Sequence, residues 1–270
     1  MPELPEVESF ARALQKEYTQ KQIKEVLFRR DNIRYVLDKK ILRKILSPGI
    51  SITRFHRDGK QLILETENGS IAISLGMSGA FHPADSRKPA KHEHVTIVFE
   101  DTTALGYIDP RRFGFWIPHN KPLSHKADPL SKSSLLLFFK SVQFMKSSRS
   151  IKNILLDQRL IGGMGNIYAA ETLYQAKIHP QASAKDIAQA KIKLLAETIP
   201  IVLNKAIDKG GSTISTYRRL NKEAGDFQEF HKVYARHGKP CLTLKCTDTI
   251  LRIVQSGRST WYCPTCQLAK

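Results

Sequence analysis

The sequence predicts an α+β protein made of several structural units: a β-rich N-terminal part, a helical middle and a small cysteine module. Three observations support this division. Short β-branched runs separated by turn signals fill residues 22–117, helical periodicity dominates after residue 134, and all four cysteines lie between residues 241 and 266. A chain of 270 residues is long enough for a sizeable core and two or three such units.

The N-terminal part, residues 1–118, is expected to form an antiparallel β-sandwich that carries one helix. Apolar side chains recur at helical spacing within residues 5–18, namely Val7, Phe10, Ala11 and Leu14. The β-rich runs that follow are residues 50–55, 62–65, 71–74 and 95–99. Turn signals such as Asp58-Gly59 and Asn68-Gly69 separate them, and short strands at this spacing are typical of a sandwich.

The remainder of the chain is predicted to be a linker, a helical domain and a terminal module. The linker is the polar, proline-containing stretch 119–134, the helical domain is 135–227 and the terminal module is 231–270. Helical patterns cover residues 135–145, 151–156, 167–176 and 184–209. Pro200 is expected to kink or divide the last of these helices. Gly210 and Gly211 end it, and a polar loop follows.

The charge of the chain indicates a nucleic-acid partner. Lysine and arginine number 43 against 25 acidic residues, which gives a net charge of +18 at pH 7. A polyphosphate backbone rewards each added cation through counterion release, whereas a single acidic substrate does not require such an excess. A merely soluble basic protein is the alternative. No basic amphipathic helix, hydrophobic signal region or run of 18 apolar residues is present, so we expect no membrane association or secretion.

The first residues, Met1-Pro2-Glu3-Leu4-Pro5-Glu6, have the composition of a nucleophilic site. Removal of Met1 would leave Pro2 as a free secondary amine, and an α-amino group has a pKa of about 7.7–8.0. Such an amine is partly uncharged at neutral pH and forms iminium intermediates with carbonyl-like carbons, while Glu3 and Glu6 can move protons. The alternative is an ordinary helix start, with early prolines and acids in the first turn.

The cysteines, Cys241, Cys246, Cys263 and Cys266, form two pairs in the pattern Cys-x4-Cys-x16-Cys-x2-Cys. Two thiolate pairs on separate turns suit one tetrahedral zinc ion. All four zinc positions would be filled by protein, so the metal is expected to be structural. The module carries excess positive charge, which favours a nucleic-acid contact over a protein contact.

Two further kinds of motif suit contacts with a nucleic acid. Gly162-Gly163-Met164-Gly165-Asn166 opens a helix whose free N–H groups, with the Asn166 side chain, can hold a phosphate. Met77, Arg111 and Phe113 lie on glycine-bounded loops and could wedge into a base stack. The alternatives are core packing for Met77 and Phe113 and a solvated charge for Arg111. Lys60, on a tight turn, could contact phosphate, as could many lysines here.

Taken together, these motifs resemble the bacterial formamidopyrimidine-DNA glycosylases, nearly end to end and in the same order. The resemblance rests on Pro-Glu-Leu-Pro-Glu-Val-Glu at the N-terminus, Gly59-Lys60, the run 75–79, the run 109–114, Leu156-Asp157-Gln158, the run 165–168, Gly210-Gly211-Ser212 and the finger with Gly257-Arg258-Ser259-Thr260. Leu4 and Arg-Arg-Phe-Gly separate the chain from the endonuclease VIII group, which usually begins Pro-Glu-Gly-Pro-Glu and prefers oxidised pyrimidines. The resemblance implies a helix-two-turn-helix domain and a β zinc finger with one structural Zn²⁺.

The resemblance also implies an activity and a set of functional residues. The expected enzyme removes 8-oxoguanine and formamidopyrimidines from duplex DNA and cuts abasic sites by β,δ-elimination, as a monomer in the bacterial cytoplasm, associated with the nucleoid. The implied catalytic residues are Pro2 as nucleophile, Glu3 as proton shuttle, Glu6 as its support and Lys60. The implied DNA contacts are Met77, Arg111, Phe113, Asn166, Tyr234 and Arg258, with Arg111 reading the opposite cytosine. The implied lesion-capping loop includes Ser212, Thr216 and Tyr217.

Three positions depart from the family pattern. The first cysteine pair is separated by four residues where the family usually has two, Ser74 stands where a histidine is typical, and Ala170 replaces an acidic residue commonly found before Glu171. None of the three removes the expected nucleophile or its acid partner. A non-catalytic DNA-binding or lesion-sensing protein is the competing hypothesis, and it would be expected to have lost Pro2 or Glu3.

Overall fold

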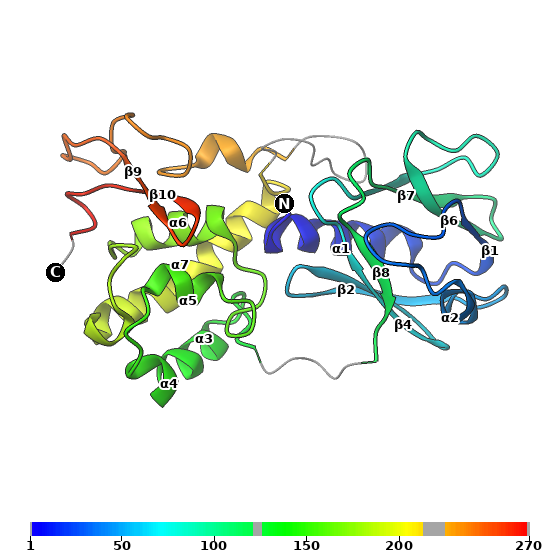
Figure 1. Cartoon of the computed structure of the whole chain (residues 1–270), viewed down its shortest axis with the longest axis horizontal. Helices are drawn as coiled ribbons and strands as arrows, with labels where there is room; N and C mark the ends of the chain where they lie inside the picture. Colours follow the sequence, from blue (N-terminus) through cyan, green and yellow to red (C-terminus); the bar gives the residue numbers. More distant parts are fainter. Residues whose placement is uncertain (1, 121–125, 213–224, 269–270) are drawn as a thin grey trace. The chain divides into compact units, whose positions relative to one another are not determined.

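A computed structural model describes residues 2–120, 126–212 and 225–268 of the chain (Figure 1). The chain forms two compact units. The first comprises Met1–Ser124 and Lys209–Gln228, and the second comprises His125–Asp208 and Glu229–Lys270. In the described residues, no helix combines the length and apolar character that crossing a bilayer would demand.

The first unit begins with helix α1, Leu4–Tyr18, which confirms the predicted N-terminal helix. Glu3 is its N-cap residue, and Glu3 and Glu6 form a reciprocal capping box that satisfies N–H groups of the first turn. The apolar face of α1 is buried, with Val7 and Leu14 fully inaccessible to solvent. The helical spacing seen in the sequence therefore identifies the face that packs on the core.

Two four-stranded antiparallel sheets make up the rest of the first unit, together with the short helix α2, Lys39–Ile45. One sheet has the order β1-β6-β7-β5, with strands Ile23–Phe28, Glu93–Phe99, Ala104–Ile108 and Ala80–Pro83. The other has the order β2-β3-β4-β8, with strands Ile52–Asp58, Gln61–Thr66, Gly69–Ser74 and Phe115–Pro118. Apolar side chains of both sheets and of α1 share one core cluster. The predicted antiparallel sandwich with its helix is therefore confirmed.

The second unit is helical. Its helices are α3 Lys132–Phe139, α4 Val142–Met145, α5 Ile151–Leu156, α6 Asn166–Gln175, the 3₁₀ turn η1 Ala184–Asp186 and α7 Gln189–Asp208. A further 3₁₀ turn, η2, covers Phe227–Phe230. The α+β class with a helical middle part is confirmed.

Two predicted helices differ from the observed ones. The stretch 135–145 is divided because Ser141 leaves the helical conformation and its hydroxyl caps the N–H of Phe144. The stretch 184–209 is divided at Ile187, which is extended, and not at Pro200, which lies inside α7. Of the expectation that Pro200 kinks or divides the helix, the division is therefore wrong, and the kink stays a prediction.

A two-stranded hairpin completes the second unit. It consists of β9, Leu251–Gln255, and β10, Arg258–Tyr262, which pair antiparallel. Ser256 and Gly257 between them have φ of 49° and 73°, as a tight two-residue turn of type I′ requires. Arg258 therefore stands at the first paired position after the turn, opposite Gln255.

Candidate active site and metal centre

The N-terminal residues form a compact acidic site around Pro2. Pro2 is buried, and Glu3 and Glu6 are 6% and 2% exposed. The backbone N–H of Glu3 donates to Glu6 Oε2 over 2.7 Å, so the capping box folds both acids around the helix start. The predicted helix start is therefore confirmed, and the nucleophilic role of Pro2 stays a prediction.

The second carboxylate oxygen of Glu6 reaches a segment far along the chain. Glu6 Oε1 accepts the N–H of Ser212 over 2.8 Å. Gly211 has φ of +79°, and a Cβ at this position would lie 2.7 Å from Glu6 Oε1, so glycine permits the close approach. Ser212 also forms an isolated antiparallel bridge with Asp226. Thr216 and Tyr217 of the predicted capping loop lie outside the described residues.

Lys60 occupies the turn between β2 and β3, after Gly59 with φ of +59°. An ion pair holds the end of β2 against α1: Arg57 Nε lies 3.0 Å from Glu8 Oε2, and the arginine side chain is only 9% exposed. The Arg57 guanidinium also donates to the carbonyl of Gly59. The turn that carries Lys60 is therefore fixed to the helix that begins beside Pro2.

The three predicted wedge residues gather at one groove of the first unit. Met77 and Phe113 are 38% and 43% exposed, and the Arg111 guanidinium lies 4.8 Å from the centre of the Phe113 ring. All three line a groove of about 690 Å³. The alternative that Met77 and Phe113 serve as core residues is wrong at this exposure. Ser74, the departure from the family pattern, lies in the same groove, and its hydroxyl accepts the N–H of Gly76.

A buried carboxylate that the sequence reasoning gave no role holds these loops together. Asp109 is fully buried; it accepts the Ser78 hydroxyl over 2.5 Å and the Gly114 N–H over 2.8 Å. The Ser78 hydroxyl in turn accepts the N–H of Arg111. The signal was present, since Asp109 precedes Pro-Arg-Arg and Ser78 follows Gly-Met. Only the fold shows that the two runs meet.

In the second unit, Asn166 begins helix α6, as predicted for a helix opened by a glycine-rich turn. Its Nδ2 donates to the carbonyl of Ser259 over 3.0 Å. Gln158 holds the glycine-rich turn: its Nε2 donates to the Met164 carbonyl and its Oε1 accepts the Gly163 N–H. Nothing in its local sequence assigns Gln158 this role, and the structure shows that it supports the turn.

The hairpin that carries Arg258 is fixed to the helices by buried polar contacts. Lys152 of α5 is fully buried and donates to the Thr260 hydroxyl and the Ser259 carbonyl, 2.5 and 3.3 Å away. Together with Asn166, Lys152 holds the backbone of β10. Arg258 itself is exposed. The hairpin is thus rigidly attached, while the guanidinium of Arg258 stays available to a ligand.

Tyr234 is positioned through Glu171. The buried Glu171 carboxylate accepts the backbone N–H groups of Lys232, Val233 and Tyr234 over 2.9, 3.0 and 2.8 Å. Burial raises the pKa of Glu171, although the three N–H donors act in the opposite direction. The neighbouring Ala170 is 2% exposed within an apolar cluster, so an acidic side chain at this position would have to be desolvated.

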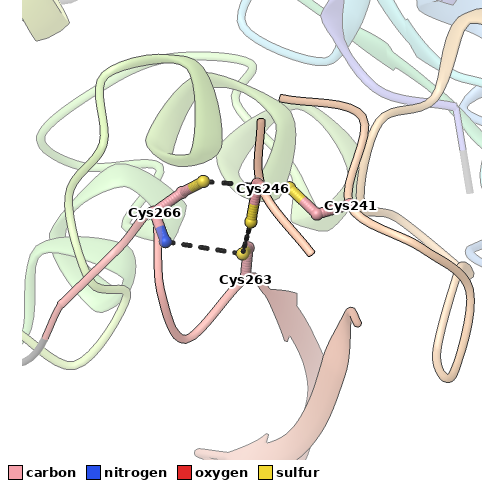
Figure 2. A group of neighbouring side chains, drawn as sticks. All are labelled: Cys241, Cys246, Cys263 and Cys266. Atoms are coloured by element: carbon pink, nitrogen blue, oxygen red, sulfur yellow. Dashed lines mark hydrogen bonds between the residues drawn. The ribbon is translucent and has the colours of Figure 1, made fainter. Parts of the chain in front are cut away.

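The four cysteines form one cluster, shown in Figure 2, whose sulfur atoms all lie within 4.8 Å of one another. Cys241 and Cys266 have sulfurs 3.8 Å apart, and Cys246 and Cys263 have sulfurs 3.7 Å apart. Two sulfurs on a tetrahedral zinc ion, with Zn–S of about 2.3 Å, lie roughly 3.8 Å apart. The site therefore fits one structural zinc ion, and the longer first spacing does not prevent it.

The environment of Cys241 favours the thiolate that zinc requires. Burial opposes ionisation, but hydrogen bonds with the Tyr174 hydroxyl and the Thr243 N–H outweigh it and lower the pKa of Cys241 to about 6. The Tyr174 hydroxyl lies 3.2 Å from Cys241 Sγ. Sequence reasoning did not identify Tyr174, because nothing in its local sequence connects it with a cysteine 67 positions away.

Three family models match the chain in succession. They are the formamidopyrimidine-DNA glycosylase N-terminal domain over residues 1–116, the H2TH domain of the same enzymes over residues 126–218, and the zinc finger found in FPG and IleRS over residues 238–269. The predicted helix-two-turn-helix domain and zinc finger are thereby confirmed.

Curated relatives and solved structures agree with these matches. The formamidopyrimidine-DNA glycosylases of Rickettsia bellii and Neisseria meningitidis serogroup A are 38% and 36% identical, and the alignments cover at least 99% of this chain and 100% of each relative. The Lactococcus lactis Fpg in complex with an abasic-site DNA is 34% identical, with a TM-score of 0.84 over 99% of this chain and 100% of that one. A mutant of that enzyme with a Fapy-dG DNA gives 35%, a TM-score of 0.85 and the same coverage.

Proposed function

The chain belongs to the formamidopyrimidine-DNA glycosylase family, and from this membership we propose how its own residues carry out the reaction. It is a base-excision-repair enzyme: a DNA glycosylase for oxidised purines with AP lyase activity. The assignment of roles rests on the buried N-terminal site, in which Pro2 is followed by Glu3 and Glu6, whose carboxylates form the capping box of α1.

In the first step, Pro2 acts as the nucleophile. Once Met1 is removed, the lone pair of the secondary amine attacks C1′ of the damaged nucleotide. The bond from C1′ to the base breaks, and the base leaves with the electron pair and takes a proton. Loss of the amine proton and opening of the sugar ring then give an iminium ion between Pro2 and C1′. Glu3, adjacent to Pro2, is the group that moves protons at the sugar.

In the second step, the iminium makes the neighbouring C2′ proton acidic. Its removal expels the 3′ phosphate by β-elimination, and a subsequent δ-elimination expels the 5′ phosphate. Hydrolysis of the iminium returns the free amine. Glu3 can serve as the base and the acid in turn because it lies at the same helix start throughout.

Glu6 acts as a positioning residue in this scheme. Its two oxygens accept the N–H groups of Glu3 and Ser212, so one carboxylate joins the nucleophile's neighbour to the start of the lesion-capping segment. These two hydrogen bonds are sufficient to account for the burial of the Glu6 carboxylate, without a direct contact between Glu6 and the DNA. Ser212, Thr216 and Tyr217 are proposed to close over the oxidised purine, with backbone N–H groups meeting its carbonyl oxygens.

Lys60, Asn166 and Arg258 are proposed to bind the phosphates that flank the extruded nucleotide. One N–H of Asn166 Nδ2 holds the Ser259 carbonyl, and the second N–H and the start of α6 face the phosphate in this proposal. Arg258 follows a tight turn on an anchored hairpin, which limits the entropy lost on binding. Tyr234, whose backbone is fixed by Glu171, adds a further contact to the DNA.

Met77, Arg111 and Phe113 are proposed to fill the space that the extruded nucleotide leaves. Their exposure at one groove supports this role, because a flat or flexible side chain must be presented to the duplex to enter the stack. Arg111, held against the face of Phe113, would bind the cytosine that was paired with the damaged base. The buried Asp109 holds the loops 75–79 and 109–114 in place while these side chains enter the duplex.

We further propose that the protein acts as a monomer, away from membranes, in the cytoplasm and in association with the nucleoid. The net charge of +18 supports non-specific association with chromosomal DNA. Sedimentation equilibrium of the free protein and of its complex with a short duplex tests the stoichiometry. A dimer in both samples would contradict this proposal.

The decisive experiment is borohydride trapping on a duplex that contains one 8-oxoguanine opposite cytosine. Processed wild-type protein, verified by mass to lack Met1 and to contain zinc, should give a covalent protein–DNA adduct. Pro2→Gly and Glu3→Gln should reduce it sharply. Glu17→Gln, an exposed acid near the other end of α1, serves as the matched control and should behave as wild type.

The alternative outcome also has a definite meaning. Tight duplex binding without an adduct from Met-free, zinc-containing protein would favour the non-catalytic DNA-binding hypothesis or a different lesion. A duplex with a pre-formed abasic site separates these two, because the lyase step requires no base recognition.

A further inference from the structure

Helix α6 contacts the C-terminal part of the second unit at three positions. Asn166 at its start donates to Ser259 of the hairpin, and Glu171 holds the backbone around Val233. Tyr174, in the last turn of the helix, contacts the zinc site. The proposed function uses the first two contacts but gives the third no role.

The Tyr174 hydroxyl lies between a zinc ligand and a threonine of the first cysteine turn. It is 3.2 Å from Cys241 Sγ and 2.8 Å from Thr243 Oγ1. A zinc-bound thiolate can only accept a hydrogen bond, so the tyrosine hydroxyl must donate to Cys241. The Thr243 hydroxyl then donates to the tyrosine oxygen. This orientation satisfies both hydroxyl groups with one chain of hydrogen bonds.

The first cysteine turn contributes little packing of its own. Leu242 and Leu244, which lie within it, are 57% and 88% exposed. The backbone N–H of Thr243 donates to Cys241 Sγ over 3.5 Å, an ordinary length for a hydrogen bond to sulfur. Thr243 is therefore the residue of this lengthened turn that points back toward α6, and it does so through Tyr174.

We propose that Tyr174 is a positioning residue for the zinc ion: its hydroxyl donates to the Cys241 ligand and, through Thr243, fixes the lengthened cysteine turn on α6. Partners of this kind around metal ligands typically change metal affinity by about 10–100-fold when they are removed. The inference concerns zinc retention and does not depend on the proposed glycosylase chemistry.

The test compares Tyr174→Phe with wild type in the full-length, metal-loaded protein. Phenylalanine keeps the ring in the apolar cluster with Val233 and Ile250 and removes only the hydroxyl. Tyr262→Phe in β10 is the matched control, because it removes a tyrosine hydroxyl from the same unit. Thr243→Val removes the second hydrogen bond and retains the tyrosine.

Two readouts follow the metal directly. Zinc competition with a chelator should show at least about a tenfold weaker affinity for Tyr174→Phe. In the Co²⁺-substituted protein, the sulfur-to-cobalt charge-transfer band should move to longer wavelength, because a thiolate without its donor gives up electron density more easily. Thr243→Val should shift both readouts in the same direction by less, and Tyr262→Phe should match wild type.

Identical zinc affinity in Tyr174→Phe and Tyr262→Phe would overturn the proposal. Weaker zinc binding with an unchanged cobalt spectrum would also overturn it, because the hydroxyl would then act through packing and not on the ligand. If Tyr174→Phe fails to fold, Thr243→Val decides: an unchanged spectrum and affinity in this variant would contradict the role assigned to the chain of hydrogen bonds. Neither readout depends on excision, so failed adduct trapping would leave this conclusion unaffected.

Discussion

Glu6 illustrates how one side chain can serve two distant segments at once. A carboxylate has two oxygens, and here each accepts a backbone N–H, one from Glu3 and one from Ser212. Both contacts are buried, so neither N–H group has an alternative partner in bulk water. The local order of the chain around Glu3 and that around Ser212 are therefore coupled through a single residue.

Glu6→Gln should separate the two reactions of the enzyme. An amide has one acceptor oxygen, so its NH₂ group must meet one of the two N–H donors, at a cost of about 1–3 kcal/mol. Single-turnover release of 8-oxoguanine should fall at least about tenfold, the equivalent of about 1.4 kcal/mol in barrier. Cleavage of a pre-formed abasic site should fall less, because no base has to be capped. Equal losses in both assays would instead place Glu6 at the amine chemistry.

His231 gives a second prediction at the scale of a residue, from its burial. Desolvation lowers the pKa of His231 to about 4, whereas an unfolded histidine titrates near 6.5. The folded state therefore holds a neutral ring, and its stability is fully present above pH 6.5. As the pH falls below 6.5, the unfolded state binds a proton that the folded state does not, so stability is lost until the pH reaches about 4.

The measurement is urea unfolding at pH 7 and pH 5 for wild type and His231→Gln. The linkage predicts a loss of about 2 kcal/mol at pH 5 from this residue. His231→Gln should lose about that much less between the two pH values, since glutamine does not titrate. The difference between the variants isolates His231 from the other histidines. A pH dependence equal in the two proteins would contradict the assigned burial effect.

At the scale of elements, strands and helices followed from local patterns, whereas their ends depended on single residues. The strands predicted at 62–65 and 71–74 lie within β3 and β4, because apolar runs between turn signals fit a buried sheet. The helix predicted over 135–145 is two helices, since Ser141 caps a new start. Whether Ser141 continues a helix or caps a new one depends on tertiary contacts, and a local sequence pattern does not contain these contacts.

The runs 75–79 and 109–114, here called the wedge loops because they carry Met77, Arg111 and Phe113, are joined by Asp109. Asp109→Asn replaces an acceptor that binds two donors with a group that must present an NH₂ to one of them. Stability should fall by about 1–3 kcal/mol, and affinity for a lesion duplex should fall with it as the wedge residues lose their support. The exposed Asp85→Asn is the matched control.

Urea unfolding and fluorescence anisotropy measure the two effects. A double-mutant cycle with Ser78→Ala should show non-additive losses, because Ser78 donates to the same carboxylate. Two results would show that the hydrogen bonds of Asp109 do not hold the wedge loops. One is additive losses of unfolding free energy in the double-mutant cycle, and the other is unchanged affinity for the lesion duplex in a destabilised Asp109→Asn protein.

At the scale of the whole molecule, the net charge of +18 favours a polyanionic partner such as DNA. Binding to duplex DNA should weaken steeply with salt, because each neutralised phosphate releases a counterion. Arg258→Ala should reduce the slope of log K against log salt by about one, for damaged and undamaged duplexes alike.

Arg87→Ala is the control for this slope, since Arg87 has a 94% exposed side chain and lies outside the proposed phosphate contacts. It should leave the slope nearly unchanged. A change of slope confined to lesion-containing DNA in Arg258→Ala would indicate that Arg258 recognises the damaged nucleotide itself and not a phosphate.

The sequence alone predicted the zinc site, the nucleic-acid partner and much of the local structure of this protein. Pro2 close to Glu3 and Glu6, four paired cysteines and a strong positive charge predict an amine nucleophile, a zinc site and a nucleic-acid partner, because these predictions depend on residue type and short spacing. The periodicities of 2 and 3.6 residues likewise require only neighbours along the chain.

Only the tertiary structure decided which residues support that chemistry. Glu6 meets Ser212 across 206 positions, Lys152 meets Thr260 across 108 and Tyr174 meets Cys241 across 67. No local period links such pairs, because the contact arises when buried polar groups must find partners inside a packed interior. The reactive groups could therefore be read from their composition and order, whereas the residues that hold them in place became visible only in the fold.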